Sequence, residues 1–113
     1  MKTKQVIDLI DKLFDIYNEE ETKDLQRDIE AFNDVKEDIS KQIQFVEEWE
    51  KDALQFIKHN KTALFPQQIN SPKDNLIKLI FNSYYKDARI KPYMNLHNSS
   101  LFILNQLNKE VDE

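Results

Sequence analysis

The sequence predicts an all-α fold, a four-helix up-and-down bundle, from two observations. Apolar residues recur at spacings of three and four along most of the 113-residue chain, as they do on one face of an α-helix. The chain also contains no glycine, the residue on which tight hairpin turns and phosphate-binding loops depend. Four amphipathic segments joined by short connections favour an up-and-down bundle. The length fits a single domain over residues 1–113.

The first two helices are expected over residues 4–18 and from just after Thr22 to about residue 59. The first should end near Asn18, a residue that tolerates a left-handed cap, because three glutamates follow and would oppose the helix dipole. No proline or glycine interrupts the second segment. The second helix is therefore either one long helix or two segments broken near Ser40.

The longest connection is expected over residues 60–70, where Pro66 and two asparagines disfavour a helix. Its apolar side chains should pack across the end of the bundle: Leu64, Phe65 and Ile69. Ser71 then resembles an N-cap, with Pro72 at the first helical position, where its missing N–H costs nothing. The fourth helix is expected from about Pro92 to Glu110.

Aromatic residues fall both on and off the expected apolar faces. Phe45, Trp49 and Phe56 lie at helical spacing in the second helix, which is typical of core positions. Phe81 and Tyr85 extend the apolar face of the third helix. Phe102 lies opposite the apolar face of the fourth helix and is expected to be partly exposed.

Several classes of chemistry lack the residues that they need. There is no cysteine for a disulfide, a thiolate metal site or a thiol nucleophile, and no glycine-rich nucleotide loop. The di-metal carboxylate bundle needs Glu three residues before each ligand histidine, but Phe56 and Met94 precede His59 and His97. We therefore expect no enzyme, no catalytic, cofactor-binding or metal-binding residues and no cofactor.

The charge is uneven along the chain. The net charge is −5, made of −7 over residues 1–60 (9 basic, 16 acidic) and +2 over residues 61–113 (7 basic, 5 acidic). The two halves either attract each other within the fold or one of them offers a surface to a partner. No concentrated basic face indicates nucleic-acid binding, and no apolar run approaches the ~20 residues that span a bilayer. We expect a cytoplasmic protein without a membrane or nucleic-acid partner.

Four residues are candidates for binding an unidentified protein partner: Phe81, Tyr85, Arg89 and Phe102. The cations Lys86, Arg89 and Lys91 near Tyr85 could bind an acidic partner or could simply be solvated at helix ends. The leading hypothesis is a non-enzymatic protein that acts through protein–protein interaction, as a monomer or a homodimer. The alternative is a small-ligand- or metal-binding bundle with a polar cavity lined by a few residues: Ser83, Tyr84, His97 and Ser100.

The second half of the chain resembles the YppE-like family of small bacterial proteins of unknown function from Firmicutes. The resemblance rests on the order and spacing of these residues: Trp49, Ala53, Leu54, Ile57, Lys58, Gln68, Ile69, Asp74, Asn75, Ser83, Tyr84, Ser99, Leu101, Phe102, Ile103 and Leu104. It implies a four-helix up-and-down bundle and no established activity or cofactor. The chain departs from the family pattern at Glu37, where a proline is expected, and at Asn98, where an acid often precedes the serine.

Overall fold

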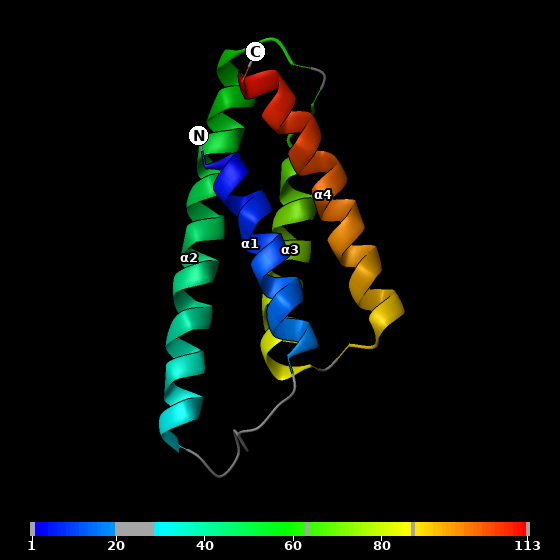
Figure 1. Ribbon diagram of the computed structural model, residues 1–113. Coiled ribbons are helices and arrows are strands. Elements are labelled where there is room, and N and C mark those ends of the chain that lie inside the picture. Colours follow the sequence, from blue (N-terminus) through cyan, green and yellow to red (C-terminus); the bar gives the residue numbers. More distant parts are fainter. Residues whose placement is uncertain (1, 20–28, 63, 87, 113) are drawn as a thin grey trace.

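The fold consists of four antiparallel helices, as the sequence predicts. The computed structural model describes residues 2–19, 29–62, 64–86 and 88–112. Its helices are α1 (Thr3–Asn18), α2 (Ile29–His59), α3 (Gln67–Tyr85) and α4 (Ile90–Asp112). They alternate in direction, so that both ends of the chain lie toward the same end of the bundle, and α2 extends beyond the other helices at the opposite end (Figure 1).

The helix α3 occupies the centre of the arrangement. It packs against α1, α2 and α4, whereas α1 packs mainly against α3 and α4 and touches α2 only slightly. Among the described residues, α2 and α4 do not meet. The bundle is therefore flattened along the diagonal that joins α1 and α3, and α2 and α4 lie on its outer sides (Figure 1).

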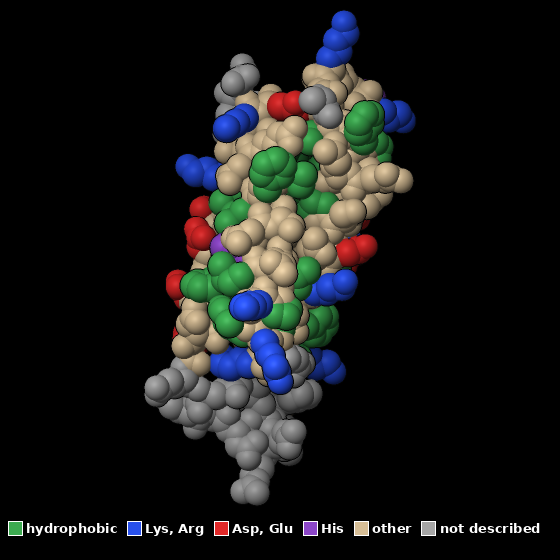
Figure 2. All heavy atoms as spheres, turned by 90° about the vertical axis from the view of Figure 1, so that its right-hand side faces the viewer, with side chains coloured by type: hydrophobic (Ala, Val, Ile, Leu, Met, Phe, Trp, Pro, Cys, Tyr) green, Lys and Arg blue, Asp and Glu red, His purple; other side chains and the backbone are tan. Residues whose placement is uncertain are grey.

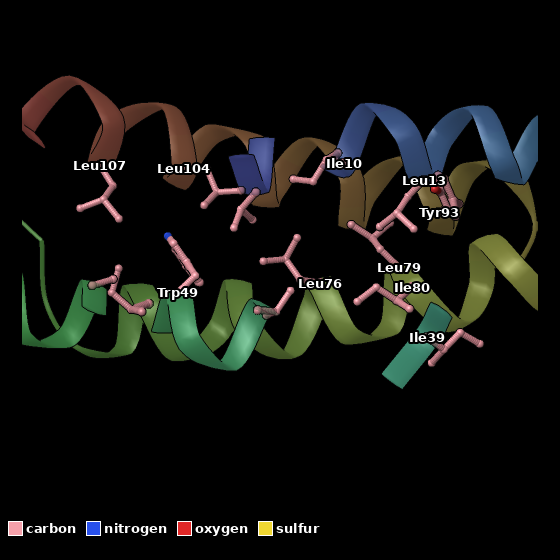
Figure 3. Close-up of a cluster of buried hydrophobic side chains, with 14 of the residues drawn as sticks. Ile10, Leu13, Ile39, Trp49, Leu76, Leu79, Ile80, Tyr93, Leu104 and Leu107 are labelled. Carbon is pink, nitrogen blue, oxygen red and sulfur yellow. The ribbon is translucent and has the colours of Figure 1, made fainter. Parts of the chain in front are cut away.

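The core receives side chains from all four helices. In Figure 3, these side chains point toward one another between the helices: Ile10, Leu13, Ile39, Trp49, Leu76, Leu79, Ile80, Tyr93, Leu104 and Leu107. Burying a large aliphatic side chain of this kind contributes roughly 1.5–3 kcal/mol. Trp49 is fully buried, and its indole Nε1 donates a hydrogen bond to Thr3 Oγ1 at 3.2 Å, which joins α2 to the start of α1.

The helix α1 has the predicted extent, but it does not end in the predicted left-handed cap. Glu19, the residue after the helix, is extended, with φ −65° and ψ 140°. The Asn18 side chain instead donates from Nδ2 to the Phe14 carbonyl at 3.0 Å. The Glu19 backbone N–H donates to the Ile16 carbonyl at 3.2 Å, so one of the last carbonyls of the helix is satisfied without a left-handed residue. Three aspartates on the side opposite the apolar face are exposed: Asp8, Asp11 and Asp15.

The helix α2 is continuous through Ser40 to His59, so the long-helix alternative is confirmed. Its predicted beginning after Thr22 lies outside the described residues. Glu37, which stands where the family pattern has a proline, is an exposed residue within this helix. Of the three aromatic residues predicted for its core face, Trp49 is fully buried, and Phe45 and Phe56 are partly buried against the core.

The predicted start of α3 at Ser71 is wrong, because the helix begins four residues earlier at Gln67. The backbone N–H groups of Ile69 and Asn70 both donate to the Pro66 carbonyl. The Gln68 side chain accepts the Phe65 N–H at 2.8 Å, which fixes the turn just before the helix. Pro72 consequently lies inside the helix, where it is buried.

Because α3 starts early, the last part of the predicted connection belongs to the helix. Leu64 and Ile69 are buried, as predicted, but Ile69 belongs to the helix. Phe65 is 70% exposed, so the prediction that it packs across the bundle end is wrong. Its backbone N–H is held by Gln68, and this places the ring on the solvent side of the turn.

The helix α3 ends in a left-handed cap made by a lysine. Lys86 has φ 56° and ψ 37°, and its N–H donates to the Asn82 carbonyl at 2.8 Å. Its Nζ donates to the Ile16 carbonyl at 2.8 Å, so the cation stands at the C-terminal end of α1, where the helix dipole favours positive charge. The next helix, α4, begins at Ile90, two residues before the predicted start at Pro92.

Candidate functional site

Phe81 and Tyr85 form an aromatic pair on the outer side of α3. They lie four residues apart, one helical turn, and their rings are nearly parallel, with centroids 6.3 Å apart and an interplanar angle of 13°. Phe81 is 41% exposed and Tyr85 is half-buried against the edge of the core. The sequence placed both residues on an extension of the apolar face, and the structure leaves Phe81 largely outside the core.

Four cations lie close to this aromatic pair in the sequence. Lys78 lies one turn before Phe81 on α3 and is exposed, and Arg89, just after the end of α3, is also exposed. Lys91 follows in the first turn of α4 and is exposed as well. Lys86 differs from these three, because its Nζ is bound to the Ile16 carbonyl. We call Lys78, Phe81, Tyr85 and Arg89 the α3 surface.

Phe102 is the other predicted partner-binding residue, and it lies on α4 rather than on the α3 surface. It is 70% exposed, which confirms that it points away from the apolar face of its helix. Within the described part of the chain, the ring contacts do not join it to Phe81 or Tyr85. Of the four predicted residues, Phe81 and Tyr85 thus form a pair on α3, Arg89 follows the end of that helix, and Phe102 lies separately on α4.

A buried polar cluster joins α1, α3 and α4. Ser83 Oγ donates to the Leu79 carbonyl at 2.6 Å and lies 2.6 Å from the Tyr93 hydroxyl. The Tyr17 ring stacks on the Tyr93 ring with centroids 4.0 Å apart. The Tyr17 hydroxyl donates to the Ala88 carbonyl at 2.6 Å. Burial raises the pKa of Tyr93 above its ordinary value, because the phenolate form is poorly solvated there.

The sequence did not reveal this cluster, because Tyr17 and Tyr93 recur at helical spacing with apolar residues and therefore resemble ordinary core positions. Ser83 and Tyr93 are both fully buried. A serine that is buried on an otherwise apolar helix face was the one available signal, since a buried hydroxyl needs a hydrogen-bond partner. With Ser83 and Tyr93 closed off from solvent, the cluster serves to join three helices.

The other residues of the predicted polar cavity have separate surroundings. The Tyr84 hydroxyl accepts a hydrogen bond from Gln42 Nε2 of α2 at 2.8 Å, and burial raises the pKa of this tyrosine. His97 packs its ring against Phe14 with centroids 5.4 Å apart, and its Nδ1 lies 3.2 Å from Asn98 Oδ1. Ser100 is buried, and its hydroxyl has no hydrogen-bond partner.

These positions do not assemble into a metal centre. Across residues 2–19, 29–62, 64–86 and 88–112, no three His, Asp or Glu side chains are grouped so that they could hold a metal ion. The hydroxyls of Ser83 and Tyr84 bind different partners on different helices, α4 and α2. None of the four helices, as far as they are described, combines the length and the hydropathy that a bilayer crossing requires.

The chain is similar to bacterial proteins of unknown function over nearly its whole length. The family model described as "Bacterial domain of unknown function (DUF1798)" matches residues 3–111. The uncharacterised protein YppE of Bacillus subtilis (strain 168) is 26% identical over 110 residues, which cover 96% of this chain and 88% of YppE.

Solved structures of YppE from Bacillus subtilis have the same fold. The crystal structure aligns with a TM-score of 0.78 and 23% identity, covering 98% of this chain and 93% of that chain. The solution NMR structure aligns with a TM-score of 0.78 and 24% identity, covering 97% of this chain and 89% of that one. With the family match over residues 3–111, the YppE-like resemblance is confirmed, and the chain belongs to the bacterial family of unknown function DUF1798.

Proposed function

We propose that this chain is a non-enzymatic cytoplasmic protein that acts by binding another protein through the α3 surface. The observation that supports this most directly is the parallel pair of Phe81 and Tyr85, with Phe81 41% exposed in a protein that buries its other α3 apolar residues more fully. Aromatic residues and arginine are enriched at protein interfaces and dominate their binding energy.

The charges around the pair favour an acidic partner. Lys78 precedes the aromatic pair by one turn of α3, Arg89 follows the end of that helix, and both are exposed; Lys91 adds a third cation close in sequence. An acidic protein would be steered toward this end of the bundle, and its apolar side chains would cover the Phe81 ring. The buried Ser83–Tyr93 cluster contributes rigidity beneath the surface, because it ties the end of α3 to α4.

Native pull-down with a matched set of variants tests this proposal. The test variant is Phe81→Ala combined with Arg89→Ala. The control is Phe65→Ala, which removes a more exposed phenylalanine, 70% exposed, at the other end of α3. Circular dichroism should show the same helical content in all three proteins, because both aromatic side chains lie outside the core.

The expected result is a protein that the wild type and Phe65→Ala retain and that the double variant loses. Binding of the recovered partner to the purified double variant should be weaker by about tenfold or more, the effect of losing a residue worth at least 1.4 kcal/mol. Equal recovery of the same proteins by all three baits would show that the α3 surface is not the binding site.

A further inference from the structure

The outer side of α4 lacks charge over most of its length. Residues 92–108 contain no Asp, Glu, Lys or Arg, although such residues make up 33% of the chain. The next longest uncharged run is residues 62–72. In Figure 2, which looks onto the side of the bundle formed by α4, hydrophobic and uncharged polar side chains cover most of the middle of the face, and Lys and Arg side chains lie in its lower part and at its margins.

This pattern sets α4 apart from the other exposed helix faces. On α1, for example, the outward positions are occupied by charged residues: Asp8, Asp11, Lys12 and Asp15. A helix face that stays in water gains solubility from charge, whereas a face that becomes buried against a partner loses free energy for every unpaired charge that it carries. Depletion of charge around an aromatic residue is the composition of an interface centre.

Six exposed residues of α4 form a line that fits another helix, with exposed Ile90, Pro92 and Ser99 lying beside it. The line is made of six exposed residues, separated alternately by four and three positions: Lys91, Asn95, Asn98, Phe102, Asn105 and Lys109. This alternation is the spacing by which one helix presents a continuous seam to a second helix. We call these six residues the α4 seam. It is roughly 27 Å long, at 1.5 Å per residue.

The α4 seam is symmetric about residue 100. If a second copy of α4 lies antiparallel on it, Asn95 faces Asn105 and Asn98 faces Phe102, and the same pairs recur on the other side of the two-fold axis. An asparagine amide both donates and accepts hydrogen bonds, so Asn95 and Asn105 can pair with each other. The two Phe102 residues then lie about 6 Å apart along the axis, close enough to cover each other.

We infer that the α4 seam is a self-association surface, on which a second copy of this chain docks with its α4 antiparallel to form a two-fold homodimer. The charges at the two ends of the helix support this occupant and this direction. Residues 86–91 carry a formal charge of +2 (three basic, one acidic), and residues 109–113 carry −2 (one basic, three acidic). Antiparallel pairing brings the opposite signs together, and it also aligns the helix dipoles favourably.

A parallel pair would be disfavoured, because it would place the two basic beginnings side by side. Antiparallel pairing has one unfavourable element, since Lys91 then faces Lys109 at each end of the seam. These lysines are at the exposed rim, where like charges are partly screened by water and salt. With one apolar anchor per copy, the dimer should be weak, with a dissociation constant on the order of 10–100 µM.

Sedimentation of the full chain over a range of concentrations tests the association. The wild type should shift from monomer to dimer between about 5 and 500 µM, a range that brackets the expected constant. Phe102→Glu should weaken dimerisation by at least about tenfold, because it places two like charges beside the axis. Phe65→Glu is the matched control, since Phe65 is equally exposed, at 70%, but lies outside α4, and it should dimerise like the wild type.

The absence of cysteine makes the orientation directly testable. Asn95→Cys and Asn105→Cys chains of different mass are mixed and oxidised mildly, and antiparallel pairing predicts the mixed disulfide as the main product. Wild-type protein that stays monomeric at 500 µM overturns the inference, and so does a dimer that Phe102→Glu leaves unchanged. Predominant Asn95→Cys homodisulfides would overturn the antiparallel direction. The dimerisation results do not depend on whether the Phe81→Ala, Arg89→Ala variant loses an acidic partner. The proposal for the α3 surface and the inference for the α4 seam can therefore fail independently.

Discussion

At the scale of single residues, the Ser83–Tyr93 hydrogen bond gives a defined contribution to stability. Tyr93→Phe removes the hydroxyl but keeps the ring stacked on Tyr17. Ser83 retains its bond to the Leu79 carbonyl, so no buried group loses its only partner. Urea unfolding should show a loss of about 1 kcal/mol, the net value of one buried hydrogen bond. A loss of 3 kcal/mol or more would show that the ring itself had moved.

The same tyrosine makes stability depend on pH in the alkaline range. Burial raises the folded-state pKa of Tyr93 above its ordinary value of 10.0, and burial raises the folded-state pKa of Tyr84 as well. The unfolded chain therefore ionises first as the pH rises. The free energy of unfolding should be insensitive to these groups below pH 10 and should fall above it. Tyr93→Phe should make that fall shallower, as measured by urea titrations at several pH values.

Removal of the Ser100 hydroxyl should stabilise the protein, because this buried hydroxyl has no hydrogen-bond partner. Ser100→Ala should raise the free energy of unfolding by about 1 kcal/mol or more, since it removes an unsatisfied polar group and improves helix propensity. Ser99→Ala is the matched control, because Ser99 is the exposed neighbour and shares only the propensity gain. Equal effects of the two substitutions would mean that the Ser100 hydroxyl is satisfied in solution.

At the scale of the helices, the end of α3 depends on a lysine in a conformation that glycine would adopt more easily. Lys86 has φ 56°. Lys86→Gly and Lys86→Ala both remove the Nζ contact with the Ile16 carbonyl, but only glycine adopts the left-handed region without strain. The glycine variant should be more stable than the alanine variant by about 1 kcal/mol, as measured by thermal unfolding. Equal stability would indicate that the cap had rearranged.

The apolar pattern of the sequence was sufficient to predict some helix boundaries and insufficient for others. The extent of α1 followed from apolar spacing, whereas the sequence left α2 as either one long helix or two segments, and the structure decides for the long helix. The start of α3 was missed, because Ser71 and Pro72 imitate a helix beginning. Burial of Leu64 and Ile69 against the core, together with the hydrogen bond from the Phe65 N–H to the Gln68 side chain, favours the earlier start, and local propensity does not register burial.

At the scale of the whole molecule, the bundle class was predictable but the arrangement of its helices was not. Alternating directions follow from short connections. The close approach of α1 and α3 depends on contacts between residues far apart in sequence, such as those of Lys86 with Ile16 and Tyr17 with Ala88. Side-chain spacing within one helix carries no information about these contacts.

The sequence predicted the exposure of a single surface residue but not how the surface residues are grouped, because grouping also depends on contacts between helices. Exposure of Phe102 followed from its position opposite the apolar face of its own helix, which is a local property. Separation of Phe102 from the pair Phe81 and Tyr85 depends on how α3 and α4 pack, so the four candidates could not be divided into two surfaces beforehand. The uncharged run over residues 92–108 is visible in the sequence, but its exposure becomes clear only with the fold.

The central claim is that this protein acts through its surface while its interior polar residues hold the helices together. A 1H–15N spectrum of the labelled protein, recorded with increasing amounts of soluble bacterial extract, tests it most directly. Partner binding should broaden or shift signals on the α3 surface, including Phe81 and Arg89, and the Phe81→Ala, Arg89→Ala variant should abolish the effect. Changes confined to the buried residues Ser83, Tyr93 and His97 would contradict the claim, because they would indicate a small ligand bound between the helices.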